Sequence, residues 1–363
     1  MTLDTVNYKT LFVFCKNQLC NYTGINMRIF QYISILLLIG VIGFIIYRNS
    51  PHYQIIKGDI FGTYYNIKIF SDKKDKNLKK TIETKLQDIN SKMSVFDKNS
   101  EISQFNNFQA KKYFKLSDEL SFVLQISKKV WQQSDGWFDP SIGKLIDAWG
   151  FGSSKKTQYS DTQIQKIVKS VGFDKIAFSK DKKQIKKHNS EISLNLSAIA
   201  KGYAVDEIAL VLDKKGYENY LIEIGGEIKA KGVRSQTDNA WIIGINKPVV
   251  DSSDNSLIVS LSNLSVATSG NYRNYYQKDK QTYVHTISPK TGLPYPSDVL
   301  SVTVFHESCM YADAYATAIE AMGSEKGLAF ANKHNIKAVI FKDDLVPVFS
   351  KTAQQLFAEY PNE

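Results

Sequence analysis

A turn, a strand and a helix follow one another over residues 283–323, and their order constrains the chain more than any other segment does. The turn is predicted at 288–292, because its proline fixes φ and its closing glycine tolerates positive φ. A β-branched run over 299–305 predicts a buried strand. The alanine-rich run over 309–322 predicts a helix, and Gly323 is expected to end it.

Asp313 and Thr317 lie four positions apart in the predicted helix, so they share one face of it. The alanines around them leave room for another backbone or a ligand. A carboxylate and a hydroxyl oxygen suit Mg²⁺, which takes few protein ligands and completes its octahedron with water and substrate phosphates. Taken alone, the pair also fits an ordinary exposed helix surface.

Residues 29–47 form the other constraining segment, because they are uncharged and long enough to span a bilayer. No small-residue cleavage site follows them, which favours an uncleaved transmembrane anchor over a signal peptide. Lys9, Lys16 and Arg28 precede the span and favour that side as the cytoplasmic one. We therefore expect a single-pass membrane protein with its large domain on the extracytoplasmic side.

The remaining chain is long enough for one large globular domain. The 363 residues are 43% hydrophobic and contain no repeat, so a sizeable core is expected over 53–360. Residues 1–28 are a short N-terminal segment, most of which a start at Met27 would remove. The net charge is +10, but the lysine clusters at 73–80 and 180–187 contain aspartates and no aromatic platform. They are interpreted as solvated loops, and nucleic acid is not an expected partner.

Periodic patterns along this domain predict alternating helices and strands. Apolar residues at helical spacing predict a helix over 78–93, and Ser117 followed by two acidic residues predicts the start of another. Leu257–Val266 is predicted to be one strand, and Ile192 onward is predicted to be a strand that passes into a helix.

Three segments of this domain carry side chains suited to a nucleotide. Residues 137–152 are rich in aromatics and glycines, so they could stack a flat ring or form a loop over the edge of the core. The junction near Lys201, with small residues before a helix, could bind phosphate or be an ordinary strand–helix connection. It lacks the G-x-x-x-x-G-K pattern. Gly225 and Gly226 allow a backbone to approach a ligand closely.

In order and spacing, these segments resemble the blocks of the ApbE family of FAD:protein FMN transferases. The blocks are 61–63, 93–106, 138–152, 194–206, 224–226, 268–270 and 285–323. The resemblance covers residues 55–360 and implies an α+β fold with mixed β-sheets and packed helices, here preceded by one N-terminal transmembrane helix. It also implies Mg²⁺-dependent transfer of FMN from FAD to a Thr or Ser hydroxyl of a target protein through a phosphoester bond, with release of AMP.

The resemblance assigns roles to particular residues. The metal ligands would be Asp313, Thr317 and the main-chain oxygen of Ala198. The FAD contacts would be Phe61, Phe96, Trp137, Phe138, Asp139, Asn195, Lys201 and Ile287. Four positions depart from the commoner family pattern: Phe61 replaces Met, Phe96 replaces Tyr, and Asn195 and Ser288 each replace Asp.

His285 begins the last of these blocks, and a side chain that titrates near neutrality fits a general base for the incoming hydroxyl. A structural role for it stays open. The expected partner is an acceptor flavoprotein subunit with a Thr or Ser site, such as a redox subunit of the sodium-translocating NADH:quinone reductase or Rnf type. Two other functions stay open: an FAD-hydrolysing or flavin-storing protein of the same fold, and a non-enzymatic, membrane-anchored electron-transfer flavoprotein.

Overall fold

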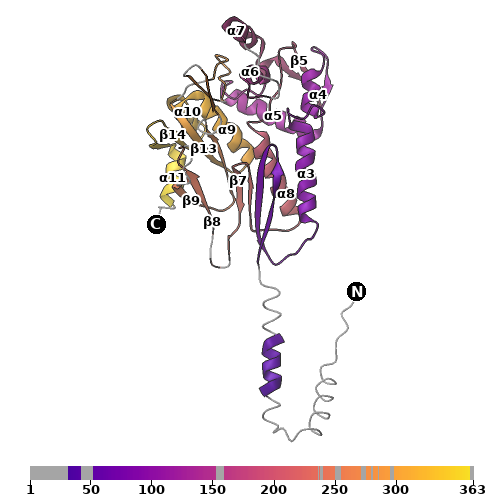
Figure 1. The fold of residues 1–363 in the computed structure, drawn as a ribbon, viewed down its shortest axis with the longest axis vertical. Helices are drawn as coiled ribbons and strands as arrows, with labels where there is room; N and C mark the ends of the chain where they lie inside the picture. Colours follow the sequence, from indigo (N-terminus) through magenta and orange to yellow (C-terminus); the bar gives the residue numbers. More distant parts are fainter. Residues whose placement is uncertain are drawn as a thin grey trace. The chain divides into compact units, whose positions relative to one another are not determined.

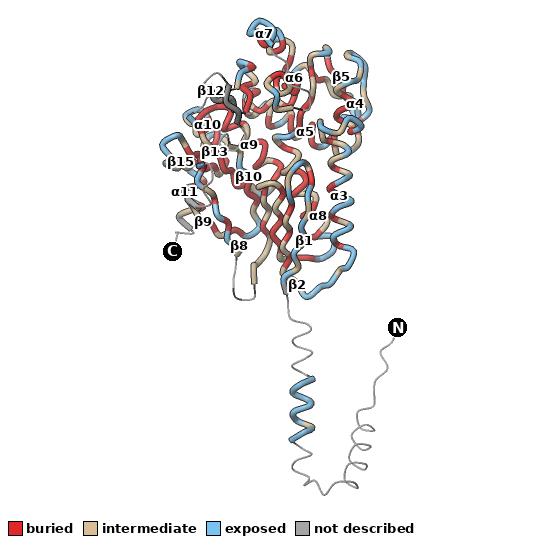
Figure 2. The backbone as a smooth tube through the Cα atoms, in the orientation of Figure 1, coloured by how far each residue is buried: buried red, intermediate tan, exposed pale blue. Residues whose placement is uncertain are grey.

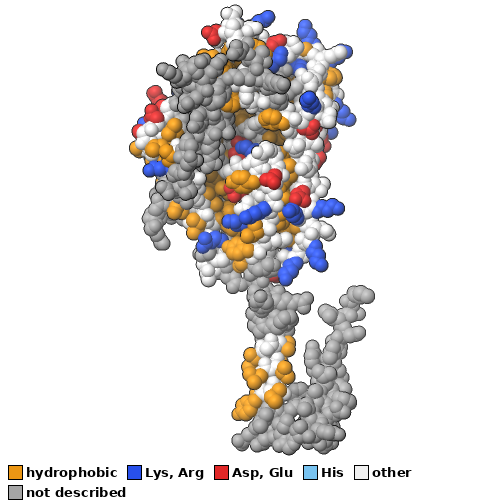
Figure 3. Space-filling view, in the orientation of Figure 1, with side chains coloured by type: hydrophobic (Ala, Val, Ile, Leu, Met, Phe, Trp, Pro, Cys, Tyr) orange, Lys and Arg blue, Asp and Glu red, His pale blue; other side chains and the backbone are white. Residues whose placement is uncertain are grey.

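The computed structural model describes residues 32–41, 52–152, 159–235, 237, 240–249, 255–270, 275–278, 281–284, 286–294 and 298–359. The chain divides into two compact units, Met1–His52 and Tyr53–Glu363. In the first unit a helix covers 32–41, and Figure 3 shows hydrophobic side chains along it. No helix within the described ranges is long and apolar enough to cross a membrane. The predicted span over 29–47 extends beyond the described residues at both ends, and segment 1–28 lies wholly outside them.

The second unit is built on an eight-stranded sheet of order β1-β2-β6-β7-β10-β13-β14-β15 (Figure 1). Its strands are β1 (His52–Ile60), β2 (Thr63–Ser71), β6 (Tyr220–Ile224), β7 (Glu227–Lys231), β10 (Leu264–Gly270), β13 (Val299–His306), β14 (Lys337–Lys342) and β15 (Pro347–Phe349). Every pairing from β2 to β15 is antiparallel. The described residues form three further small sheets. One has the order β3 (Phe114–Lys115), β5 (Gln184–Lys187), β4 (Ile176–Phe178). The other two are the pairs β8 (Trp241–Asn246) with β9 (Asn255–Leu261), and β11 (Tyr275–Lys278) with β12 (Gln281–Val284).

The helices of this unit are α3 (Leu78–Met93), α4 (Glu101–Asn107), α5 (Asp118–Gln133), α6 (Gly143–Ala148), α7 (Asp161–Ser170), α8 (Ala200–Lys214), α9 (Cys309–Met322), α10 (Ser324–Lys333) and α11 (Lys351–Glu359). Helix α9 packs against α8, β10 and β13. A Cβ on Gly202 would lie 2.4 Å from the carbonyl oxygen of Cys309, so glycine is what lets α8 approach α9 this closely. The two helices that carry the predicted site residues are thereby held together.

Two apolar cores include residues of the sheet, and Figure 2 shows that the strands and the helices beside them are largely buried. Val302 and Val304 of β13 belong to the large core with α3, α8 and α9, whereas Phe305 belongs to a second core with β8, β9 and α11. A strand buried on both faces reads as a continuous apolar run. The predicted buried strand over 299–305 is confirmed by β13 for this reason.

Two predicted strands are wrong in their extent. Leu257–Val266 divides into β9 and β10 because Asn263 turns the chain with a φ of 56°. Residues 192–196 form no regular strand and have a single bridge, from Ser193 to Ile142. The backbone of Leu194 is instead paired by the side-chain amide of Asn106, at 2.7 and 2.8 Å. This amide takes the place of a neighbouring strand, so the segment stays extended without joining a sheet.

Candidate active site

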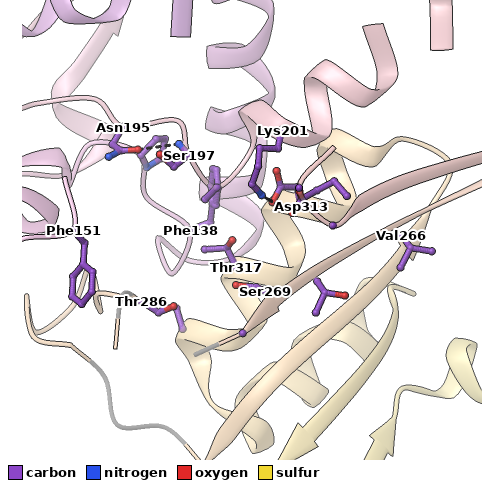
Figure 4. Close-up of a pocket in the computed structure, with 18 of the residues that line it drawn as sticks. Phe138, Phe151, Asn195, Ser197, Lys201, Val266, Ser269, Thr286, Asp313 and Thr317 are labelled. Carbon is purple, nitrogen blue, oxygen red and sulfur yellow. Dashed lines mark hydrogen bonds and ion pairs between the residues drawn. The ribbon is translucent and has the colours of Figure 1, made fainter. Parts of the chain in front are cut away.

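A cavity of about 910 Å³ opens where α8, α9, β7, β10 and the loop after α5 converge (Figure 4). Its size is at the upper end for small-molecule sites, and a dinucleotide needs that much room. Nine predicted site residues line it: Trp137, Phe138, Asp139, Asn195, Ala198, Lys201, Ile287, Asp313 and Thr317. Segments separated by up to 180 positions in the sequence therefore meet at one surface.

The other three predicted site residues are placed differently. Phe61 sits in the turn between β1 and β2 with a φ of 54° and packs against the large core, outside the cavity lining. Phe96 follows α3 and is 65% exposed, also outside the lining. His285 lies outside the described residues, whereas its chain neighbours Thr286 and Ile287 both line the cavity.

Asp313 lies at the centre of a buried charge cluster. The residue is only 5% exposed, its Oδ2 accepts a hydrogen bond from the backbone N–H of Gly202 at 3.0 Å, and its Oδ1 lies 4.0 Å from Nζ of Lys201. The same Nζ donates to Oε1 of Glu227 at 2.5 Å. One ammonium group thus faces two carboxylates, and Figure 4 shows Lys201 beside Asp313 with Thr317 further along α9.

Burial and charge shift the protonation of this cluster in opposite directions. Burial raises the pKa of both Asp313 and Glu227 above their ordinary values, and Lys201 offsets part of that shift. Burial alone would lower the pKa of Lys201, but the two carboxylates outweigh it and raise that pKa. The lysine therefore stays charged, and among the described residues it is the single counter-charge for two buried carboxyl groups.

Glu227 is a member of this cluster that the sequence patterns did not identify. It is 2% exposed, and its Oε2 has no hydrogen-bond partner in the part of the chain that the structure describes. The residue directly follows Gly225 and Gly226, whose φ values of 59° and 102° turn the chain from β6 into β7. The sequence did contain one indication of its role: Glu227 is a charged residue directly after a glycine pair that was expected to approach the ligand.

The donor set of the cavity fits Mg²⁺. Hard oxygens are available from the carboxylate of Asp313, the hydroxyl of Thr317 and the backbone of Ala198, all of which line it. No group of three or more His, Cys, Asp or Glu side chains able to hold a metal occurs among the residues with described positions. A sparse set of oxygen ligands is what Mg²⁺ accepts when water and phosphate complete its shell.

Asn195 shapes the entry to α8. Its Oδ1 accepts a hydrogen bond from the backbone N–H of Ser197 at 2.9 Å, and its own N–H donates to the carbonyl of Pro140 at 2.8 Å. An aspartate could make the same side-chain bond, since Asn and Asp both form turns of this type. The exchange therefore preserves the local turn while removing one negative charge from the cavity.

The carboxylate of Asp139 accepts hydrogen bonds from its own loop and from a later segment of the chain. Its Oδ1 accepts from the N–H and hydroxyl of Ser141, at 2.8 and 2.6 Å, and its Oδ2 accepts from the N–H of Phe173 at 3.2 Å. Burial raises its pKa, and these hydrogen bonds act in the opposite direction. Asp139 thus holds the aromatic loop of Trp137 and Phe138 against the cavity.

The turn after residue 287 is confirmed. The N–H of Gly292 donates to the carbonyl of Ser288 at 2.8 Å, and Gly292 has a φ of 72°. Ser288 is fully buried, and its hydroxyl accepts a hydrogen bond from the N–H of Thr291. The serine that replaces the usual aspartate therefore takes part in the turn.

Glu320 is a second buried acid that the sequence patterns did not identify. It lies on α9 beyond Thr317, is 0% exposed, and its Oε2 accepts from the hydroxyls of Ser269 and Thr286. Burial raises the pKa of Glu320 from 4.5 to about 7, against the effect of those two hydrogen bonds.

The raised pKa of Glu320 predicts a pH-dependent stability. The folded state holds this proton more tightly than the unfolded state, so the contribution is full below pH 4.5 and is lost as the pH rises through about 7. Relative to Glu320→Gln, the wild-type free energy of unfolding should fall by about 2–3 kcal/mol between roughly pH 5 and pH 8. Urea unfolding of both proteins across this range checks it. A constant difference between the two proteins would show that Glu320 does not titrate there.

Comparison with known proteins identifies the family of the chain. The family model described as "ApbE family" matches residues 61–340. The chain is 34% identical over 313 residues to an FAD:protein FMN transferase of Vibrio cholerae, covering 85% of this chain and 91% of that protein. It is 28% identical over 284 residues to an FAD:protein FMN transferase of Escherichia coli, covering 77% and 81%.

Solved structures show the same fold. The flavin transferase ApbE from Vibrio cholerae superposes with a TM-score of 0.77 at 32% identity, covering 85% of this chain and 100% of that one. The flavinyl transferase ApbE of Pseudomonas stutzeri, in its apo form, gives a TM-score of 0.76 at 28% identity, covering 85% and 98%.

The α+β fold and the cavity therefore define an enzyme of the flavin transferase class. The chain belongs to the ApbE family. The fold that the sequence resemblance implied is confirmed for the second unit, with its sheets and packed helices.

Proposed function

We propose that this protein transfers the FMN part of FAD to a Thr or Ser hydroxyl of a target protein in a Mg²⁺-dependent reaction. The product is a phosphoester, and AMP leaves. The observation that carries the proposal is the convergence of Lys201, Asp313 and Thr317 on one dinucleotide-sized cavity, where a single ammonium group faces two buried carboxylates. The carboxylates would attract a cation, and the ammonium group of Lys201 would attract a diphosphate.

The residues around the cavity have distinct proposed roles. Asp313, Thr317 and the carbonyl of Ala198 would hold Mg²⁺. When bound, this ion supplies Lewis-acid stabilisation of charge on the phosphate oxygens. Lys201, charged and beside the start of α8, would bind the diphosphate. Glu227 holds Lys201 in place through its 2.5 Å contact.

The remaining contacts concern the organic parts of FAD. Trp137 and Phe138 offer aromatic surface in the cavity, and Asp139 keeps their loop in place. Asn195 and Ile287 line the same space. Two further contacts follow from the family resemblance alone and lie outside the lining, at Phe61 and Phe96. His285 is the proposed base that takes the proton of the incoming hydroxyl.

A single incubation tests the reaction. The protein is mixed with FAD, Mg²⁺ and a candidate acceptor domain, and intact mass and released nucleotide are measured. We expect the acceptor to gain the mass of FMN less one water as AMP appears in equal amount. Release of both FMN and AMP without a covalent adduct would identify a hydrolase instead. A bound, redox-active flavin without AMP formation would identify an electron-transfer flavoprotein.

We further propose that residues 29–47 anchor the enzyme in the inner membrane with the catalytic domain on the periplasmic side. The support is the uncharged span, the basic residues before it and the absence of a cleavage site. Acceptors would then be membrane or periplasmic redox subunits, for example of the sodium-translocating NADH:quinone reductase or Rnf type.

Fusions at Glu363 test this topology. A reporter that is active only outside the cytoplasm should be active there, and one that is active only in the cytoplasm should be silent. Deletion of 29–47 should reverse both results, because the domain would lose its export signal. Activity of the cytoplasmic reporter on the intact chain would overturn the proposed orientation.

A further inference from the structure

Two hydroxyl groups on the cavity lining are held by one buried carboxylate. Ser269 of β10 and Thr286 both line the cavity, and both donate to Oε2 of Glu320, the second at 3.0 Å. Glu320 itself is absent from the lining and is 0% exposed. We call Ser269 and Thr286 the hydroxyl wall. Figure 4 shows both with their oxygen atoms among the residues that surround the cavity.

The contacts with Glu320 determine what the hydroxyl wall can bind. A hydroxyl has one proton to donate and two lone pairs that accept. Because Glu320 takes both protons, only lone pairs remain for a ligand. The other carboxylate oxygen, Oε1, is buried without a hydrogen-bond partner among the described residues and can carry a proton without disturbing Oε2. The wall therefore accepts hydrogen bonds whether or not Glu320 is ionised.

We propose that the hydroxyl wall is a subsite for the hydrogen-bond donors of the ligand, and that Glu320 is the positioning residue that sets this polarity. The inference rests on the proposed function, in which the ligand is FAD. FAD has O–H and N–H donors on its ribityl chain, ribose, flavin ring and adenine, but none on its ionised diphosphate. A phosphate oxygen would meet lone pairs at the wall and be repelled.

The charge distribution of the cavity supports the same orientation. Among the described residues that line it, Lys201 is the only cationic side chain, and it belongs to the cluster of Asp313 and Glu227. The diphosphate is attracted to that cluster through Lys201 and the proposed cation. The hydroxyl wall then contacts a part of FAD that carries donors, so the two features orient the dinucleotide in one direction.

Binding measurements with two probes test this subsite. The probes are FAD and inorganic pyrophosphate, each with Mg²⁺, because pyrophosphate at neutral pH offers the charge of the diphosphate without the organic donors. Ser269→Ala and Thr286→Val should each weaken FAD binding about five- to tenfold, as expected for one lost neutral hydrogen bond. Pyrophosphate affinity should stay within about twofold of wild type. A parallel loss of pyrophosphate affinity, or unchanged FAD affinity, would overturn the proposal.

Two variants of Glu320 separate positioning from simple packing. Glu320→Gln retains a carbonyl oxygen that can accept from both hydroxyls, so FAD affinity should stay close to wild type. Glu320→Met has similar length but no acceptor, so the hydroxyls can turn their protons toward the cavity, and FAD affinity should fall about tenfold. Equal affinity in both variants would remove Glu320 from this role. If the methionine variant does not fold, the Ser269 and Thr286 variants decide the question.

Ser265→Ala is the matched control. Ser265 lies on the same strand, is buried, and donates to the carbonyl of Glu307 outside the cavity lining. This variant should leave FAD affinity unchanged. Transfer to an acceptor by the wild-type protein is measured in parallel. If the wild-type protein forms no FMN adduct, the proposed function fails. If it transfers FMN but the variants bind FAD as the wild type does, only the subsite fails.

Discussion

Asp313→Ala is expected to abolish FMN transfer, by at least about 10³-fold, while the domain stays folded. Asp313 is the only charged side chain proposed as a Mg²⁺ ligand, and it is buried with its Oδ1 4.0 Å from Lys201. Its removal leaves Lys201 paired with Glu227 alone, which would balance the charge of the cluster without a cation. The measurement is the transfer rate over a Mg²⁺ titration, with a melting curve for each protein.

Asp313→Asn is the control for structure. Its amide oxygen can still accept the hydrogen bond from the N–H of Gly202, so the contact between α8 and α9 should persist. We expect this variant to melt close to wild type and still fail in transfer. Full Mg²⁺-dependent activity of either variant at low metal concentration would show that the metal site lies elsewhere.

His285→Asn is expected to lower the transfer rate by about 10²–10⁴-fold, the usual contribution of a positioned general base. Its neighbour Thr286 lines the cavity and is held by Glu320, so the chain at this point reaches the site. FAD binding and melting temperature should change little. Single-turnover transfer at saturating FAD, alongside a melting curve, makes the measurement, and an unchanged rate would exclude His285 from the chemistry.

His306→Asn is the comparison variant, and it is expected to affect stability but not the transfer rate. His306 ends β13, and its Nδ1 accepts a hydrogen bond from the N–H of Ser308 at 2.9 Å, outside the cavity lining. Burial lowers its pKa, as expected for a histidine held neutral for structural reasons. This variant should lose stability and keep its transfer rate. If His285→Asn behaved in the same way, His285 would have a structural role too.

Local sequence determined the regular elements of this protein well. The helix predicted over 309–322 is α9, from Cys309 to Met322, and Gly323 ends it with a φ of 81°. Ser117 caps α5 by accepting from the N–H of Leu120, as the acidic first turn indicated. Alanine content, a capping hydroxyl and a glycine act over a few residues, so their effect is visible in the sequence.

The family resemblance in the sequence also named residues that the fold brings to one cavity. Lys201, Asp313 and Thr317 were each named from a motif, and the cavity brings them together. Their grouping depends on the close approach of α8 to α9 at Gly202. No periodicity encodes that approach, because it joins residues more than a hundred positions apart.

Tertiary structure alone decided the rest. Glu227 and Glu320 look like ordinary charged residues of a strand and a helix, yet both are buried against the cavity lining, one beside Lys201 and the other beneath Ser269 and Thr286. The segment before α8 has the alternation of a strand, but Asn106 pairs it instead of a sheet. A side chain's burial and its hydrogen-bond partners are set by segments distant in the chain, and local sequence does not specify which segments will meet.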